Sequence, residues 1–318
     1  MLVSEMASTV EPAIGRRDQT APRITVGLPV YNGQRFVAQA IESVLTQTYG
    51  DFELLISDNA STDETPRICQ DFALRDRRIR FMSNDHNLGA ARNYNRLVHE
   101  ARGEMFKWMP ADDVLAPSFL ERCLAALDAE QASVLSYPTT VMIGEEGESL
   151  DKDPLDRLEV HAMEPHQRFR EYVEWSFHNR GSNAVLGLMR TDVLRRTALI
   201  GPYAGSDKVL LGELALHGTF ARLADPLFFR REHRDSSLQA HPQWADRYRW
   251  FDPSMTGAYR MGNWRLFAEY FRAIAHTPIG TRNALRSYGH MMRYFSLYWP
   301  RLLQELRMMI RYAVPFLR

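Results

Sequence analysis

Short apolar runs alternate with stretches of helical periodicity between residue 24 and about residue 130. Runs rich in β-branched and aromatic residues are typical of strands, whereas apolar positions spaced three or four residues apart are typical of helices that bury one face. After the first run, Val37, Ile41 and Val44 fall on one stripe, and Gln39 and Glu42 fall off it. The predicted strands cover 24–29, 52–57, 79–83 and 105–109, and a helix follows each. A repeat of roughly 27 residues predicts a parallel sheet with right-handed crossovers, flanked by helices.

The helix ends of this first part have recognisable signals. Ser61 and Glu64 have the spacing of a capping box, which predicts that the second helix begins there, and Gly103 marks the end of the third. Further along, the predicted elements are a helix over 117–130, a strand over 134–143, a polar stretch to 165, a strand over 184–189, a helix over 206–217 and a strand-like run over 220–230. From about residue 244 the chain is predicted to be helical.

The pattern divides the chain into four parts. They are a flexible leader over 1–22 with no assigned role, an α/β half over 23–130, an irregular acceptor-side half of the same domain over 131–243, and a helical C-terminal region over 244–318. Ligands of such sheets bind beyond the carboxyl ends of the strands, so the strand-to-helix turns are the places to inspect.

Composition narrows the class of protein. Among 318 residues, 39 Lys and Arg balance 39 Asp and Glu, which argues against nucleic-acid binding by bulk charge. The two cysteines, Cys69 and Cys123, lie in apolar helical patterns and predict neither a disulfide framework nor a metal site. No secretory signal or run of about 18 apolar residues occurs. We expect a cytoplasmic protein, with a peripheral position at the inner face of the membrane left open.

Polar and flexible residues follow each of the first three strands. Pro29, Tyr31, Asn32 and Gly33 precede a helix N-terminus, where a base could stack and a phosphate could bind. Asp58 stands at the end of the second strand and could accept hydrogen bonds from a base or a ribose, although Asp is also a common turn residue.

The third strand leads to Gly89 and Arg92. Gly89 permits close approach of the backbone, and Arg92 could meet a diphosphate or be a solvated surface residue.

The fourth strand ends at two adjacent carboxylates, Asp112 and Asp113. Adjacent negative charges are unfavourable without a cation, and oxygen ligands suit Mg²⁺ or Mn²⁺ bound to a diphosphate. The alternative is that Asp113 caps a helix that follows it.

Together the segments ITVGLPVYNG, FELLISDNASTDET, NLGAARNYN and WMPADDVL resemble the nucleotide-sugar-binding half of the inverting family 2 glycosyltransferases. The resemblance covers about residues 23 to 130 and implies the Rossmann-like GT-A fold, a mostly parallel sheet flanked by helices. It implies that Tyr31 and Asp58 hold the nucleoside, that Arg92 lies near the diphosphate, and that Asp112 and Asp113 bind the metal. Many relatives have an acidic residue where this chain has Pro110, so fewer carboxylates face the metal here.

The second half resembles the same family around AVLGLMR and GSDKVLL. In relatives the carboxylate at the latter position is the catalytic base, which implies this role for Asp207, whereas its rival reading is a helix cap. His233, in the segment RREHRDSS, resembles a family histidine that completes the metal or diphosphate contacts, and its alternative is a surface histidine.

The resulting prediction is a metal-dependent inverting glycosyltransferase that uses a nucleotide-sugar donor, with UDP-sugars favoured, and a glycan or lipid-linked acceptor. A nucleotidyltransferase is the rival enzyme, but it would be expected to have a Gly-rich basic loop after the first strand, which residues 31–34 do not supply. A catalytically silent nucleotide-sugar-binding protein is the other rival.

The end of the chain is basic and aromatic. Residues 291–318 contain five arginines and one acidic residue, Glu305. Such a helix could lie at a membrane surface, or pack on the body of the protein or on a second subunit in a homodimer.

Overall fold

A computed structural model of the chain describes residues 21–152, 157–178, 183–234, 236, 244–254 and 261–313. The leader predicted over 1–22 therefore lies almost wholly outside the described residues. The first strands are β1 (Ile24–Val30), β2 (Phe52–Asp58), β3 (Ile79–Ser83) and β4 (Met105–Trp108), and all their pairings with one another are parallel. Helices α1 (Val37–Leu45), α2 (Thr65–Arg75) and α3 (Ala90–Glu100) connect them. This part of the structure confirms the predicted parallel α/β arrangement.

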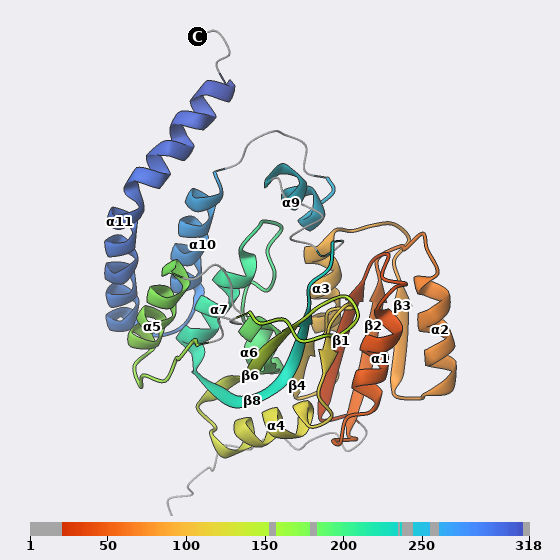
Figure 1. Cartoon of the computed structure of the whole chain (residues 1–318). Coiled ribbons are helices and arrows are strands. Elements are labelled where there is room, and N and C mark those ends of the chain that lie inside the picture. Colours follow the sequence, from red (N-terminus) through yellow and green to blue (C-terminus); the bar gives the residue numbers. More distant parts are fainter. Residues whose placement is uncertain are drawn as a thin grey trace, which may run out of the picture.

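The later strands make the sheet mixed. The elements are β5 (Val114–Leu115), α4 (Phe119–Ala129), β6 (Ser133–Ile143), α5 (Pro165–His178), the 3₁₀ helix η1 (Asn183–Leu186), β7 (Leu188–Arg190), α6 (Thr191–Leu194), α7 (Ser206–His217) and β8 (Thr219–Arg231). The strand order in the described chain is β3-β2-β1-β4-β7-β6-β8-β5, and β7 is antiparallel to both β4 and β6. Figure 1 shows β1 to β4 side by side in this sheet. Among the described residues that come later, the helices are α9 (Trp244–Phe251), α10 (Gly262–His276) and α11 (Thr281–Ala313), in agreement with the helical C-terminal region predicted from the sequence.

Alternate side chains of the strands feed two cores on opposite faces of the sheet. Leu54 and Ile56 of β2 join the core with α1, α2 and α4, whereas Leu55 faces the core with α3, α5, α7, α10 and α11. The core that contains Leu55, called the second core below, also includes Phe106 of β4 and Met291 of α11, so it joins the sheet to the C-terminal helices. The boundary predicted at residue 244 stays a prediction, but the apolar core is continuous across it.

Helix α7 lies at the centre of the second core. It is buried nearly all round, and a side chain in place of Gly212 would come within 2.7 Å of the Tyr270 ring of α10. The hydroxyls of Tyr172 (α5) and Tyr270 both donate to the carbonyl oxygen of Lys208, at 2.6 and 3.2 Å. Helices from both sides of α7 in the sequence therefore hold its first turn.

Several local predictions were wrong. Helix α2 begins at Thr65 without a capping box, because the Ser61 hydroxyl instead accepts a hydrogen bond from the Asn32 amide. Helix α3 ends at Glu100, and the Gly103 amide donates to the Thr25 hydroxyl of β1 at 2.9 Å. The first half of the strand predicted over 184–189 belongs to η1, and only its end is in β7. Helix α5 was not predicted. No helix in the described part of the chain has the length and apolar character needed to cross a membrane.

Candidate active site

The loops after the parallel strands meet at one edge of the sheet. The Asn59 amide donates to the Val30 carbonyl at 2.9 Å, and the Asn84 amide donates to the Asp58 carbonyl at 2.8 Å. These bonds continue the pairing of β1, β2 and β3 beyond the strand ends, so the residues that follow the strands lie side by side, as the parallel arrangement predicted.

In the loop after β1, one predicted residue, Asn32, holds the loop in place, and another, Tyr31, has an exposed side chain. Asn32 has φ +50°, donates its amide to Ser61 Oγ at 2.8 Å and accepts the Thr62 amide on Oδ1 at 2.8 Å. Its polar groups therefore join the β1 and β2 loops. Tyr31 is 48% exposed at the surface, and Pro29 is buried in β1. Of the residues predicted in this turn, only Tyr31 presents a large side chain to solvent.

Asp58 is almost fully buried at the end of β2, with 1% of its surface exposed. Its Oδ2 accepts hydrogen bonds from the Ser61 amide at 3.2 Å and the Ser83 hydroxyl at 3.3 Å. Its Oδ1 is also buried, yet no described residue donates a hydrogen bond to it. A buried carboxylate oxygen without a donor is unfavourable, so this atom is suited to an incoming N–H or O–H group.

A set of hydrogen-bonded asparagines holds the neighbouring loop in place, a role that was not predicted from the sequence. Asn59 Oδ1 accepts from Asn84 Nδ2 at 3.0 Å and from the Leu88 amide at 2.9 Å, while its Nδ2 donates to Asn87 Oδ1 at 2.9 Å. Asn93 of α3 joins the set through Asn84 Nδ2 at 3.1 Å. The sequence feature that could have indicated this network is the presence of four Asn residues within 35 positions, close to the ends of two strands. Their hydrogen bonds hold in place the loop that leads into α3.

Gly89 begins α3 with φ +82°, a conformation that residues with a side chain rarely adopt. A Cβ atom built on it would lie 2.5 Å from the Phe251 carbonyl oxygen and 2.6 Å from Pro253 Cδ. The close approach predicted for Gly89 therefore occurs, but the neighbour is this chain's own segment after α9, which covers the start of α3 (Figure 1). Arg92, one turn along, is exposed and forms no ion pair with a described residue.

The two adjacent carboxylates have different surroundings. Asp113 is buried, and its Oδ1 accepts the Arg231 amide at 2.8 Å. Burial and the charge of Asp112 raise the pKa of Asp113 well above its usual value. No helix follows Asp113 directly, since Val114 and Leu115 form β5 and pair with β8, so the reading of Asp113 as a helix cap is wrong.

Asp112 lies beside His233. Its Oδ2 is 3.0 Å from His233 Nε2, and its side chain is 33% exposed. His233 is buried against the Phe36 ring, and its Nδ1 has no hydrogen-bond partner among the described residues. The reading of His233 as a surface histidine is therefore wrong.

These residues offer a metal a small donor set. The described residues contain no group of three or more His, Cys, Asp or Glu side chains arranged to hold an ion. Asp112 and His233 provide one carboxylate and one imidazole side by side, with the second carboxylate of Asp113 adjacent in the chain. Mg²⁺ and Mn²⁺ are commonly held by one or two carboxylates together with substrate phosphates. The residues thus fit an ion that a diphosphate helps to bind.

Asp207 lies in the first turn of α7, whose N-cap residue is Gly205. No side chain of the described residues forms a capping hydrogen bond at the beginning of this helix. Burial raises the pKa of Asp207, and the charges of Lys208 and Arg230 act in the opposite direction. A partly exposed carboxylate with a raised pKa is suited to accept a proton.

Arg230 and Arg231 of β8 were not assigned roles from the sequence, and they differ sharply in surroundings. Arg231 is buried, stacks on the Phe36 ring and donates to the carbonyl oxygens of Asp112 (2.9 Å) and Gly144 (3.0 Å), among others. Arg230 donates to Asn183 Oδ1 at 2.7 Å but forms no ion pair within the described chain. Its positive charge lowers the pKa of both Asp113 and Asp207, so it lies within electrostatic reach of both carboxylates.

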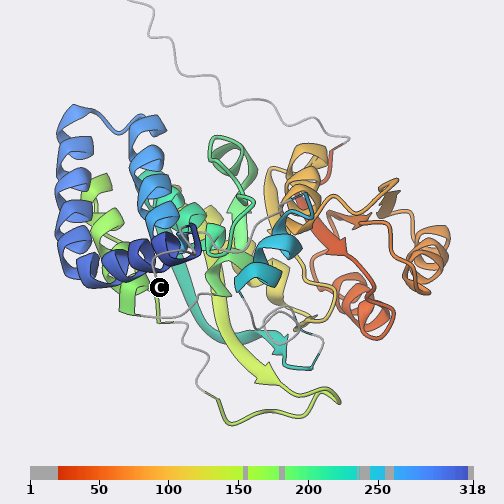
Figure 2. The same ribbon diagram turned by 90° about the horizontal axis from the view of Figure 1, so that it is seen from above.

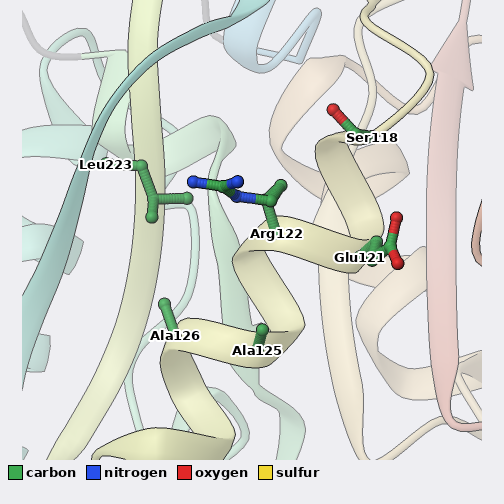
Figure 3. Close-up of a pocket in the computed structure, with 6 residues that line it drawn as sticks. All are labelled: Ser118, Glu121, Arg122, Ala125, Ala126 and Leu223. Atoms are coloured by element: carbon green, nitrogen blue, oxygen red, sulfur yellow. The ribbon is translucent and has the colours of Figure 1, made fainter.

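A surface pocket lies elsewhere, between α4 and β8. It is lined by Ser118, Glu121, Arg122, Ala125, Ala126 and Leu223 (Figure 3). Arg122 reaches across it and pairs with Asp225 at 2.9 Å. None of the predicted site residues lines this pocket.

Comparison with known proteins gives the class. The model of the family described as Glycosyl transferase family 2 matches residues 25–196, which is more than half of the chain. The chain belongs to this family.

Among curated relatives, the chain is 27% identical over 203 residues to the chondroitin synthase of Escherichia coli, covering 62% of this chain and 29% of that protein. It is 27% identical over 242 residues to an uncharacterized glycosyltransferase of Haemophilus influenzae, covering 71% of each. The chain thus spans less than a third of the length of the first of these relatives.

Solved structures show the same fold. TarS 1-349 of S. aureus in complex with UDP-GlcNAc superposes with a TM-score of 0.61 at 14% identity, covering 91% of this chain and 81% of that one. The mannosyltransferase PcManGT of Pyrobaculum calidifontis, in complex with GDP-Man and Mn²⁺, gives a TM-score of 0.50 at 15% identity, covering 93% and 81%. The chain has the predicted GT-A fold, a mixed sheet flanked by helices with a helical C-terminal segment.

Proposed function

We propose that the protein transfers a sugar from a nucleoside-diphosphate sugar to an acceptor hydroxyl, with inversion at the anomeric carbon. The observation that carries the proposal is the relation of Arg230 to two carboxylates on different elements, Asp113 after β4 and Asp207 on α7. A single displacement on a diphosphate sugar needs a base near the acceptor hydroxyl and positive charge near the leaving diphosphate, and this arrangement offers both.

The donor nucleoside would bind at the ends of β1 and β2. The free Oδ1 of Asp58 would accept a hydrogen bond from the base or ribose, and the exposed ring of Tyr31 would stack on the base. Arg92, which is exposed in the first turn of α3, would face the diphosphate. The solved relatives bind UDP-GlcNAc and GDP-Man, and a UDP-sugar is the donor we favour.

Asp112, Asp113 and His233 would hold a divalent ion, Mg²⁺ or Mn²⁺, together with the diphosphate. When bound, the ion would neutralise negative charge that develops on the leaving diphosphate. Arg230 would add a fixed positive charge to the same region, because no carboxylate of the described chain pairs with it directly.

Asp207 would act as the general base. Its carboxylate would take the proton of the acceptor hydroxyl as the oxygen attacks the anomeric carbon from the face opposite the diphosphate. The sugar–phosphate bond breaks as the new glycosidic bond forms, the bonding pair leaves with the nucleoside diphosphate, and no covalent enzyme intermediate is needed. The acceptor would be a glycan or a lipid-linked glycan in polysaccharide synthesis, met on the cytoplasmic side.

The test is a thermal-stability panel with uridine, thymidine, guanosine and adenosine diphosphates, each with and without Mn²⁺. A ligand that binds only the native state raises the melting temperature. We expect one nucleotide to raise it in a Mn²⁺-dependent manner, and Asp58→Asn to abolish the shift. Asp71→Asn, on the exposed side of α2, is the matched control. Folded protein that responds to none of the nucleotides would contradict the donor site. A response without sugar transfer would favour a silent binding protein.

A further inference from the structure

Helix α11 lies at the edge of the molecule in both views (Figures 1 and 2). One of its faces packs inward, where Met291 and Leu302 are fully buried and Tyr294 is nearly so. The Tyr298 hydroxyl donates to the Phe177 carbonyl of α5 at 2.6 Å. The inner face of this helix therefore packs on the body of the protein, as one of the predicted alternatives had it. The outer face does not.

The outer face of α11 carries large apolar side chains in solvent. Leu285 is 66% exposed and Leu297 is 63% exposed, with Met292, Trp299 and Ile310 between 42% and 54%. Exposed apolar groups scattered singly are ordinary, but Leu285, Met292 and Trp299 recur every seven residues and so share one face of the helix, which marks an interaction surface.

The charges on this outer face all have one sign. Arg282, Arg286, Arg293, Arg301 and Arg307 are exposed along it. The one acidic residue between 281 and 310 is Glu305, and its carboxylate is used inside the molecule. It accepts the Asn263 amide at 3.0 Å and Asn263 Nδ2 at 2.7 Å, at the beginning of α10.

Exposed apolar residues next to arginines limit the kind of partner that could bind this face. A second copy of the chain docked through the same face would bring like charges together, which is unfavourable. A nucleic acid would match the arginines but would not bury the apolar side chains. A bilayer with anionic headgroups satisfies both, because apolar groups enter the headgroup region while long arginine side chains remain at its surface.

We propose that the outer face of α11 before Pro300, which carries Leu285, Met292 and Trp299 together with three of the exposed arginines, docks on the surface of an anionic lipid bilayer. This part of the helix lies in the plane of the interface and does not cross it. The proposal goes beyond the proposed transfer reaction and does not depend on it.

The test is co-sedimentation of the full chain with vesicles of phosphatidylcholine alone and of phosphatidylcholine mixed with phosphatidylglycerol. We expect binding to the mixed vesicles only, weakened by added salt. The triple variant R282Q/R286Q/R293Q removes three charges and is expected to lower the partition coefficient roughly hundredfold. The matched control R75Q/R77Q/R102Q removes three exposed charges elsewhere and is expected to bind as the unaltered chain does.

A second variant, L285S/M292S, tests the apolar part without changing charge, and is expected to weaken binding to the mixed vesicles. Equal binding to neutral vesicles, or no binding to either, would overturn the proposal. So would a dimer, seen by sedimentation equilibrium, that L285S/M292S dissociates. Nucleotide-dependent thermal shifts measured on the same variants separate this result from the proposed function, since the donor site contains none of these residues.

Discussion

His233 Nε2 lies 3.0 Å from Asp112 Oδ2, although the two residues are 121 positions apart in the chain. The contact joins the loop after β4 to the end of β8, and it forms because β5 pairs with β8 beside it. If this pair holds the metal, His233→Ala removes one donor and is expected to raise the half-saturating Mn²⁺ concentration at least about tenfold. Nucleotide-dependent thermal shifts titrated with Mn²⁺ measure it. His99→Ala, exposed on α3, is the control, and equal Mn²⁺ dependence of both variants would exclude His233 as a ligand.

Asp207→Asn is expected to lower the rate of sugar transfer by about 10² to 10⁴ while donor affinity stays unchanged, since the amide cannot take a proton. Transfer to an acceptor and nucleotide binding are measured on the same preparation. Asp192→Asn is the control, because that exposed carboxylate of α6 forms an ion pair with Arg196 and with no other described residue. Loss of nucleotide affinity in Asp207→Asn would assign Asp207 to donor binding.

The pH dependence of transfer follows from the surroundings of the same carboxylate. A base is active when ionised, and burial raises the pKa of Asp207 above its ordinary value of 3.8, so kcat/KM is expected to rise with pH through a midpoint above that value. The Arg230 charge lowers this pKa, so Arg230→Gln is expected to move the midpoint to higher pH, and Arg230→Lys is expected to restore it in part. A midpoint that does not move in Arg230→Gln would contradict the assignment.

Gly89→Ala is expected to destabilise the fold by at least about 1–3 kcal/mol, the typical cost of a backbone conformation that is nearly restricted to glycine. The backbone at Gly89 has φ +82°, and the added methyl group would overlap the Phe251 carbonyl. Urea unfolding measures the change. Gly50→Ala, which meets no atom within 4 Å, serves as the reference and is expected to be close to neutral.

Lys107 is fully buried in β4, between the rings of Phe119 and Phe228, and burial lowers its pKa to about 7. From pH 10.5 down to about 7 the unfolded chain binds a proton that the folded chain does not, so folding stability falls as pH falls. Lys107→Met removes this loss. The variant also loses the hydrogen bonds from Lys107 Nζ to the carbonyl oxygens of Trp108 and Leu186, so the expected result is a change with pH: its stability relative to the unaltered chain improves as the pH falls from about 10 to about 7.

Thermal unfolding at several pH values measures the effect of Lys107→Met. Lys152→Met, at an exposed position, is the control and is expected to show no comparable pH-dependent gain. A gain for Lys107→Met that does not change with pH would show that Lys107 is not the titrating group.

The strands β1 to β4 could be predicted from the sequence because each is an apolar run followed by a helix with one clear stripe. The alternation failed where tertiary contacts decided the structure. Val114 and Leu115 form a strand only because β8 pairs with them, and η1 replaces part of a predicted strand. Helix α5 was not predicted because it lies outside the regular alternation of strands and helices from which the earlier helices were predicted.

The candidate site shows the same division. The carboxylates at strand ends could be located because parallel strands bring their carboxyl ends together. The free oxygen of Asp58, the contact of Gly89 with the chain at Phe251, and the difference between Arg230 and Arg231 depend on distant segments. Residue type alone could not distinguish two adjacent arginines.

The Lys208 carbonyl accepts hydrogen bonds from the hydroxyls of Tyr172 on α5 and Tyr270 on α10, and this limits which segments of the protein can be exchanged independently. Asp207 precedes Lys208 directly, so its position depends on Tyr270, which lies more than sixty residues later. A chimaera that exchanged the C-terminal helices for those of a relative would therefore also change the support of the proposed base. Acceptor preference in such a chimaera could shift without any substitution in the loops around the donor.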